Sequence, residues 1–317
     1  MRWWAVGVLL VACQRDGPTP NAPSTPKVSA PIASVGLARP DHPLTQLEAR
    51  TYALALVNRD RASAGLGAVV LDEIATAAAE RHVADMAHRG FTAHFGSDGS
   101  VPDLRYTQAG GQDLVVENVA CSKDGKEHVV EAGPFDPEEI ERIEARFFDE
   151  KPPHDGHRKN ILDPLHRRVG LSFAGGSGSK VVCATQEFVR HHGTYEPLPR
   201  VAKPGDVIAI RGELASPFEF GAIGIARLDR PAPKPVSWLA ASGGHALPDP
   251  HVLFQTKEFE GQHPVTVVGR RFAIEVPLDS VALAGKKSGA YVVIVYGTTK
   301  DAAGRLDPLS ARIVDVP

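Results

Sequence analysis

Few residues of this 317-residue chain could carry covalent chemistry. A hydrolase needs a nucleophile beside a base, and Ser97 and Ser100 lie close to His94 in the sequence. No Gly-x-Ser-x-Gly elbow surrounds either serine, and Cys183 would lose its nucleophilicity in a disulfide. The sequence therefore shows no nucleophile within a recognisable catalytic motif. A function without catalysis is the favoured interpretation.

The three cysteines exclude a disulfide-rich scaffold and an all-cysteine zinc site. Cys13 ends a short apolar stretch behind Arg2, a layout typical of a secretory signal over residues 1–13. The Leu-Val-Ala-Cys ending resembles a bacterial lipobox, which implies a lipid anchor at Cys13, and an ordinary cleaved signal with a chance cysteine is the alternative. Gln14 in place of an Asp favours sorting to the outer membrane or the cell surface.

Export would place the two remaining cysteines outside the cytoplasm. Cys121 and Cys183 are then candidates for a disulfide, and two buried free thiols are the alternative. Residues 14–43 are rich in Pro, Ser, Ala and Thr and show no apolar periodicity, so we expect a disordered tether there. After residue 12 no apolar run reaches the roughly 18–20 residues that span a bilayer, which predicts that no internal transmembrane helix follows.

Residues 44–195 combine helical and strand patterns. A capping box at Thr45 predicts a first helix that stops near Gly65, and an Ala-rich run predicts a second helix over 71–89. Asp136-Pro137 opens a third over about 136–150. Strand-like runs occupy 114–121, 168–173 and 181–189. This order predicts a small antiparallel sheet covered by helices on both faces, an α/β/α body.

Several short motifs stand in order along this region. They are Asn58-Arg59-Asp60-Arg61 with Gly65-Leu66, Ala78 to Met86, Phe91-Thr92-Ala93-His94, Glu117-Asn118-Val119-Ala120, Gly156-His157-Arg158-Lys159-Asn160-Ile161-Leu162, and Thr185-Gln186. Together they resemble the CAP superfamily of cysteine-rich secretory proteins, antigen 5 and pathogenesis-related 1 proteins, also called the SCP domain. The resemblance covers about residues 44–190 and implies an α/β/α sandwich.

The resemblance also implies a central cleft lined by two His and two Glu. By motif, His94 is the first His and Glu117 the first Glu. Glu150, at the aromatic-rich end of the third helix, is the assigned second Glu, and Glu144 is a weaker candidate.

The second His of the family is missing from the last strand. Val182 and Cys183 occupy the positions where eukaryotic relatives carry a Gly-His pair. His154 and His157 are the side chains that could reach the same cleft instead.

A set made of His94, Glu117 and Glu150 allows three kinds of role. It could bind Zn²⁺ or another divalent metal with an open coordination position. Two facing carboxylates could instead raise one pKa and form an acid/base pair. The third role is wholly structural, with the side chains bonded to their neighbours.

Residues 196–317 change to short Val- and Ile-rich runs separated by turns, after a linker at Glu196-Pro197-Leu198-Pro199. Seven or eight strands in this length predict an all-β sandwich of immunoglobulin-like size. The sequence of this part shows no cluster of metal ligands, no catalytic motif around a nucleophile and no phosphate-binding loop. We therefore expect it to form a binding surface or a spacer.

The net charge of the chain limits the classes of partner that it could bind. A net charge of −3 excludes broad, charge-driven binding to nucleic acid or to an anionic membrane. We therefore expect an exported, lipid-anchored cell-envelope protein whose cleft binds a small ligand, lipid or peptide. The alternative is a hydrolase that acts on protein or cell-wall polymer through His94, Glu117 and Glu150.

Overall fold

The computed structural model describes residues 37–122, 124–257, 264–278, 288–301 and 304–317. The predicted signal over 1–13, the predicted lipidation at Cys13 and most of the predicted tether over 14–43 lie outside these residues. Within them, none of the helices is both long enough and apolar enough to span a bilayer.

A mixed sheet forms the centre of the first region, residues 44–192. Its strands follow the order β1 (Val70–Leu71), β4 (Arg168–Gly176), β5 (Val182–Arg190) and β2 (Leu114–Cys121), and β3 (Val130–Glu131) also pairs with β4. The sequence predicted an antiparallel sheet, but β1 runs parallel to β4. With two residues β1 is too short to show an apolar run, which is why the sequence pattern missed it. β2 ends the path of strands, so one of its sides has no strand partner.

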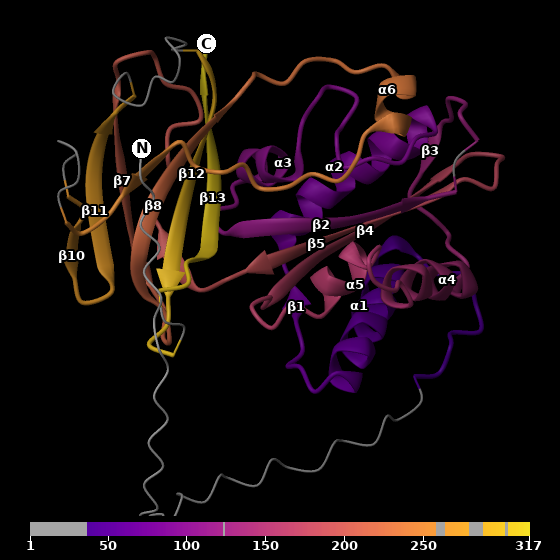
Figure 1. Ribbon diagram of the computed structural model, residues 1–317. Coiled ribbons are helices and arrows are strands. Elements are labelled where there is room, and N and C mark those ends of the chain that lie inside the picture. Colours follow the sequence, from indigo (N-terminus) through magenta and orange to yellow (C-terminus); the bar gives the residue numbers. More distant parts are fainter. Residues whose placement is uncertain (1–36, 123, 258–263, 279–287, 302–303) are drawn as a thin grey trace, which may run out of the picture. The chain divides into compact units, whose positions relative to one another are not determined.

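Helices lie on both sides of this sheet (Figure 1). One side carries α1 (Gln46–Ser63), α4 (Pro137–Phe148) and α5 (Gly156–Ile161), and the other carries α2 (Glu73–Arg89) and α3 (Pro102–Ala109). The predicted capping box at Thr45 is present, and α2 ends at Gly90 in the left-handed conformation. The mixed α/β prediction is confirmed, whereas the short α3 was missed.

Small side chains let α2 lie close to the sheet. A Cβ added at Gly170 of β4 would come within 2.2 Å of the Ala75 backbone, so only glycine fits there. Ala78 and Val115 are buried in the same small cluster, between α2 and β2. The Ala-rich pattern of α2 therefore sets the spacing between helix and sheet.

Two four-stranded antiparallel sheets form the second region, residues 193–317 (Figure 1). One has the order β10 (Thr266–Val268), β11 (Arg271–Pro277), β7 (Val207–Leu214), β6 (Gly193–Tyr195). The other has the order β13 (Asp307–Val316), β12 (Gly289–Thr298), β8 (Glu219–Leu228), β9 (Val252–Phe254). Both sheets contribute to one hydrophobic core, for example through Ile210 and Val293.

The structure moves the boundary between the regions. The sequence placed it between 195 and 196, because Glu196-Pro197-Leu198-Pro199 reads as a linker. β6 lies before that point, yet it pairs with β7 of the second region. Its Tyr195 is buried in the core of the second region, so the change of sheet comes at Gly193.

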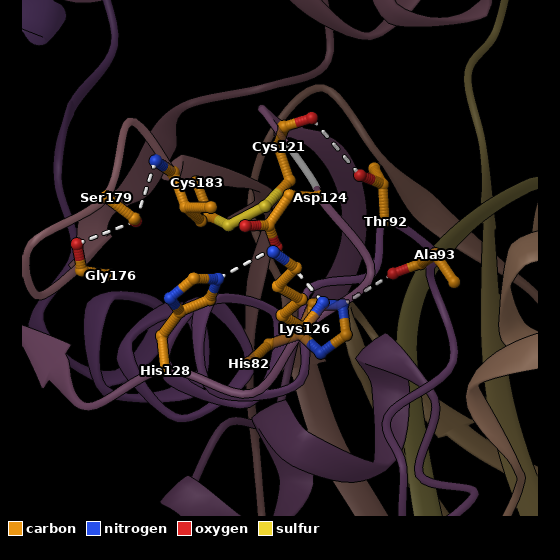
Figure 2. Close-up of a disulfide and its surroundings, with 11 residues drawn as sticks. His82, Thr92, Ala93, Cys121, Asp124, Lys126, His128, Gly176, Ser179 and Cys183 are labelled. Atoms are coloured by element: carbon orange, nitrogen blue, oxygen red, sulfur yellow. Dashed lines mark hydrogen bonds and ion pairs between the residues drawn. A yellow bond between two sulfur atoms is a disulfide. The ribbon is translucent and has the colours of Figure 1, made fainter.

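The predicted disulfide between Cys121 and Cys183 is confirmed. The two residues are direct partners in the pairing of β2 with β5, so the bond links neighbouring strands across a sequence separation of 62 (Figure 2). It closes a loop that contains α4, α5 and β4.

Replacing both cysteines, as Cys121→Ser with Cys183→Ser, should lower the free energy of unfolding by about 4 kcal/mol. The reason is the loop-closure entropy that a disulfide of this sequence separation removes from the unfolded chain. Urea unfolding measures it, and a reductant added to the wild type should reproduce the loss. Equal urea midpoints for the oxidised wild type and the double variant would contradict it.

Candidate functional site

A cleft of about 560 Å³ lies beside β2. It is lined by all four side chains that the sequence assigned to the site, namely His94, Glu117, Glu150 and His157. His154, the alternative to His157, lines it as well. Further walls come from both regions, with Pro102, Asp103, Leu114, Val115, Val116, Gly156, Asn160, Arg190, Gly244, His245, Leu247 and Pro308.

His94 and Glu117 form the first pair in the cleft. Nδ1 of His94 lies 2.9 Å from Oε1 of Glu117. An ionised carboxylate can only accept, so Nδ1 carries the proton. In the neutral ring this leaves the lone pair of the other nitrogen, Nε2, free to accept a hydrogen bond.

The buried guanidinium of Arg105 keeps Glu117 ionised. Arg105 donates to Oε2 of Glu117 at 2.6 Å, and both side chains are almost fully buried. Burial opposes ionisation, yet Arg105, together with His82 and His94, holds the pKa of Glu117 well below its usual range. The second guanidinium nitrogen also donates to the carbonyls of His94 and Ser100, so Arg105 links α3, the loop before it and β2.

His157 and Glu150 form the second pair. Oε1 of Glu150 lies 2.6 Å from Nδ1 of His157, and Oε2 accepts the backbone N–H of His157 at 2.9 Å. Both carboxylate oxygens therefore hold the first turn of α5 to the end of α4. His157 thus brings a second imidazole to the cleft, from α5.

The two pairs face each other across the cleft. The ring centroids of His94 and His157 lie 6.4 Å apart. Neither Nε2 atom donates or accepts a hydrogen bond within the part of the chain that the structure describes. Each imidazole is thus fixed by a carboxylate at one nitrogen and available at the other, an arrangement suited to hydrogen bonding with a ligand or to proton transfer.

Glu187 is a second buried carboxyl that the sequence reasoning missed. It is the direct cross-strand partner of Glu117 and is fully buried. Burial and the charge of Glu117 raise the pKa of Glu187 well above its usual range, so this acid is protonated while Glu117 is ionised. Glu117 and Glu187 thus form a buried pair of carboxyl groups that the sequence analysis did not name.

His82 and Glu144 lie outside the cleft. His82 is a core histidine whose Nε2 bonds the carbonyl of Ala93 at 2.7 Å, and burial with the nearby Arg105 lowers its pKa to about 4. Glu144 is buried against Gln186, and burial with the neighbouring Asp60 raises its pKa to about 8. Glu150, rather than Glu144, is therefore the acid that reaches the cleft.

A segment of the second region forms one wall of the cleft. The chain between β8 and β9 includes α6 (Val236–Ala241) and reaches the first region (Figure 1). Its His245 bonds Asp103 through Nε2 at 2.7 Å, and the rings of Trp238 and His245 both pack edge-on against Phe95. This contact could not be predicted from the sequence, since these residues are far apart in the chain.

Comparison with known proteins finds a family match within the first region. Residues 54–188 match the CAP family model, described as the Cysteine-rich secretory protein family. The match confirms the resemblance seen in the motifs and covers less than half of the chain. A search of curated proteins finds no match.

Among solved structures, a similar chain is an extracellular protein containing a SCP domain from Bacillus anthracis str. Ames. It is 20% identical with a TM-score of 0.33, over 46% of this chain and 41% of that chain. The present chain thus spans less than half the length of that protein.

The residues of this cleft do not fit a divalent metal ion. Within the described ranges, no group of three or more His, Cys, Asp or Glu side chains could hold one. Both oxygens of Glu117 are already bonded, to His94 and to Arg105, and the guanidinium would repel a cation. Zinc binding therefore stays a prediction that this geometry does not support.

The protonated state of Glu187 should appear in the pH dependence of stability. Its pKa is raised on folding from a usual value of 4.5, so the folded state holds a proton that the unfolded state releases as the pH rises above about 4.5. Through Glu187 alone, each pH unit in that window should cost about 1.4 kcal/mol of stability.

Glu187→Gln should remove this contribution to the slope, so the variant gains stability relative to the wild type as the pH rises from 5 to 8. Urea unfolding at both pH values measures it, with exposed Glu127→Gln as the control. Parallel pH profiles for the wild type and Glu187→Gln would show that Glu187 is not protonated in the folded state.

Proposed function

We propose that this chain is an exported ligand-binding protein of the cell envelope, whose CAP cleft takes a small ligand, lipid or peptide. The observation that carries the proposal is the pair of fixed imidazoles, His94 and His157, facing each other in a cleft of about 560 Å³. On this proposal, an α/β/α sandwich carries the cleft and a β-sandwich closes one side of it.

The lining of the cleft supports binding. Apolar side chains such as Pro102, Leu114 and Leu247 lie beside the polar groups. Preformed pockets that combine apolar walls with a few fixed polar groups are typical ligand sites. The polar groups are held by partners in the protein and need no ordering on binding, which lowers the entropy cost of association.

Binding should depend on His157. We would offer the full chain three probes in equilibrium dialysis: palmitate, N,N′-diacetylchitobiose and a library of capped tetrapeptides. For any probe that binds, His157→Ala should weaken binding about three- to tenfold, the effect of one lost hydrogen bond. Surface variant His42→Ala is the control, since His42 is exposed and, among the described residues, its ionic partners are Asp41 and Glu48. Binding of no probe, or equal affinity in His157→Ala, would reject the cleft as the site.

A hydrolase is the second candidate, favoured by the two facing His–Glu pairs. One imidazole could accept a proton while the other donates one, without a protein nucleophile. The same variants, assayed for turnover of casein and peptidoglycan, separate the candidates. Turnover that is lost in His94→Ala and in His157→Ala would favour the hydrolase over a binding protein.

Export and lipid anchoring at Cys13 complete the proposal. The disulfide between Cys121 and Cys183 is compatible with an oxidising compartment outside the cytoplasm, and residues 1–13 have the layout of a lipoprotein signal. In bacterial cells, a metabolic acyl label should appear on the full chain and be absent from Cys13→Ser. An unlabelled wild type would reject the anchor at the outer membrane or cell surface.

A further inference from the structure

The backbone groups of β2 alternate between its strand partner and the cleft. In an antiparallel pair, the N–H and C=O of one residue point to the partner strand and those of the next residue point away. The carbonyls of Asp113, Glu117 and Cys121 all point away from β5. They accept from the Ala311 N–H at 3.5 Å, the Asn160 side chain at 3.3 Å and the Thr92 hydroxyl at 3.5 Å (Figure 2 shows the last).

The backbone N–H and C=O of Val115 also point away from β5, because Val115 lies two residues from both Asp113 and Glu117 along the chain. Its strand partner Val189 accepts from the Arg167 N–H on the other side of β5, which confirms the assignment. The N–H and C=O of Val115 therefore point to the open edge of β2. Among the described residues neither group has a hydrogen-bond partner, although Val115 is only 3% exposed. Buried backbone groups nearly always have a hydrogen-bond partner. The N–H and C=O of Val115 are therefore suited to pairing with a bound ligand.

The open edge is a short window inside the cleft. At Asp113 it is closed by β13 through Ala311, and at Glu117 it is closed by α5 through Asn160. The four residue steps between these points span roughly 13 Å of extended chain. His94 and His157 lie at the Glu117 end of this window, and Leu247 and Pro308 also line the cleft.

We propose that the ligand of this cleft is a short, uncharged, extended peptide segment whose backbone pairs with Val115. The inference rests on the proposed function of the cleft. A peptide brings both an N–H for the Val115 carbonyl and a carbonyl for the Val115 N–H, the pattern of strand addition to a sheet edge. A fatty acid brings no N–H donor, and so would leave the Val115 carbonyl unpaired.

Charge and size define the peptide further. The acids of the cleft each have a basic partner, namely Glu117 with Arg105, Glu150 with His157 and Asp103 with His245. A charged peptide would therefore gain little, whereas apolar side chains would pack on the apolar walls. A window of roughly 13 Å takes three or four extended residues.

The test uses backbone methylation of the probe. The parent is the capped tetrapeptide Ac-Ala-Val-Leu-Ala-NH2, compared with forms that are N-methylated at one position each. In either strand orientation a single peptide N–H donates to the Val115 carbonyl. Methylation at that position should weaken binding at least about tenfold, while methylation at a neighbouring position, whose N–H points away, should change it little. The amide signal of Val115 should shift in NMR spectra of the full chain when the parent peptide is added.

A protein variant gives an independent readout. Val115→Pro removes the outward N–H without removing a hydrogen bond from the β2–β5 ladder, and proline is accepted on strand edges for that reason. It should lose peptide affinity at least about tenfold, with thermal unfolding reporting whether the fold is kept. Equal affinities for all methylated forms, or an unshifted Val115 amide in the complex, would overturn the inference whether or not Val115→Pro folds.

The outcome also separates this inference from the function on which it rests. If palmitate or N,N′-diacetylchitobiose binds in a His157-dependent way and no capped peptide does, the peptide inference fails and the cleft function stands. If none of the three probes binds, both fail.

Discussion

The buried ion pair between Arg105 and Glu117 is the interaction on which the site depends. It joins α3 to β2, and the same guanidinium holds the carbonyls of His94 and Ser100. Removing one partner of such a pair leaves an uncompensated buried charge, at a cost of about 3–5 kcal/mol. The pair also fixes the ionised state of Glu117, and that charge selects the tautomer of His94. The contact between Arg105 and Glu117 thus positions the backbone at His94 and Ser100, keeps Glu117 ionised and orients the ring of His94.

Two regions of the chain are needed to build the cleft. Val101 and Leu114 pack with Val292 and Ile294 in a single hydrophobic cluster that crosses from the first region to the second region. Hydrogen bonds join the same surfaces, since the Ser310 hydroxyl donates to the Gln112 carbonyl at 2.5 Å. The chain after α6 then adds His245 against Asp103. On the proposed function, this cleft wall from outside residues 54–188 would contribute to ligand preference.

The sequence predicted those parts of the structure that local patterns determine. The capping box at Thr45 and the glycine that ends α2 mark helix ends, and the ordered motifs led to His94, Glu117, Glu150 and His157. The parts that it missed depend on strand register and on long-range packing. Nothing local indicates that Glu187 faces Glu117, since that contact exists only once β2 and β5 pair. Likewise, Arg105 lies in a helix of eight residues that shows too little periodicity to be recognised.

The contrast between Glu117 and Glu187 favours hydrogen bonding over metal binding as the proposed use of the cleft. Two buried carboxyl groups in direct cross-strand contact cannot both ionise without a large electrostatic cost. Arg105 bonds one of them, so Glu117 keeps the charge and Glu187 keeps the proton. A divalent ion at the same place would have to displace the guanidinium from Glu117, which would remove the contact that holds α3 to β2. The guanidinium already neutralises the negative charge that would attract a cation. What the cleft offers to a ligand is therefore the free nitrogens of His94 and His157 and the open backbone edge at Val115.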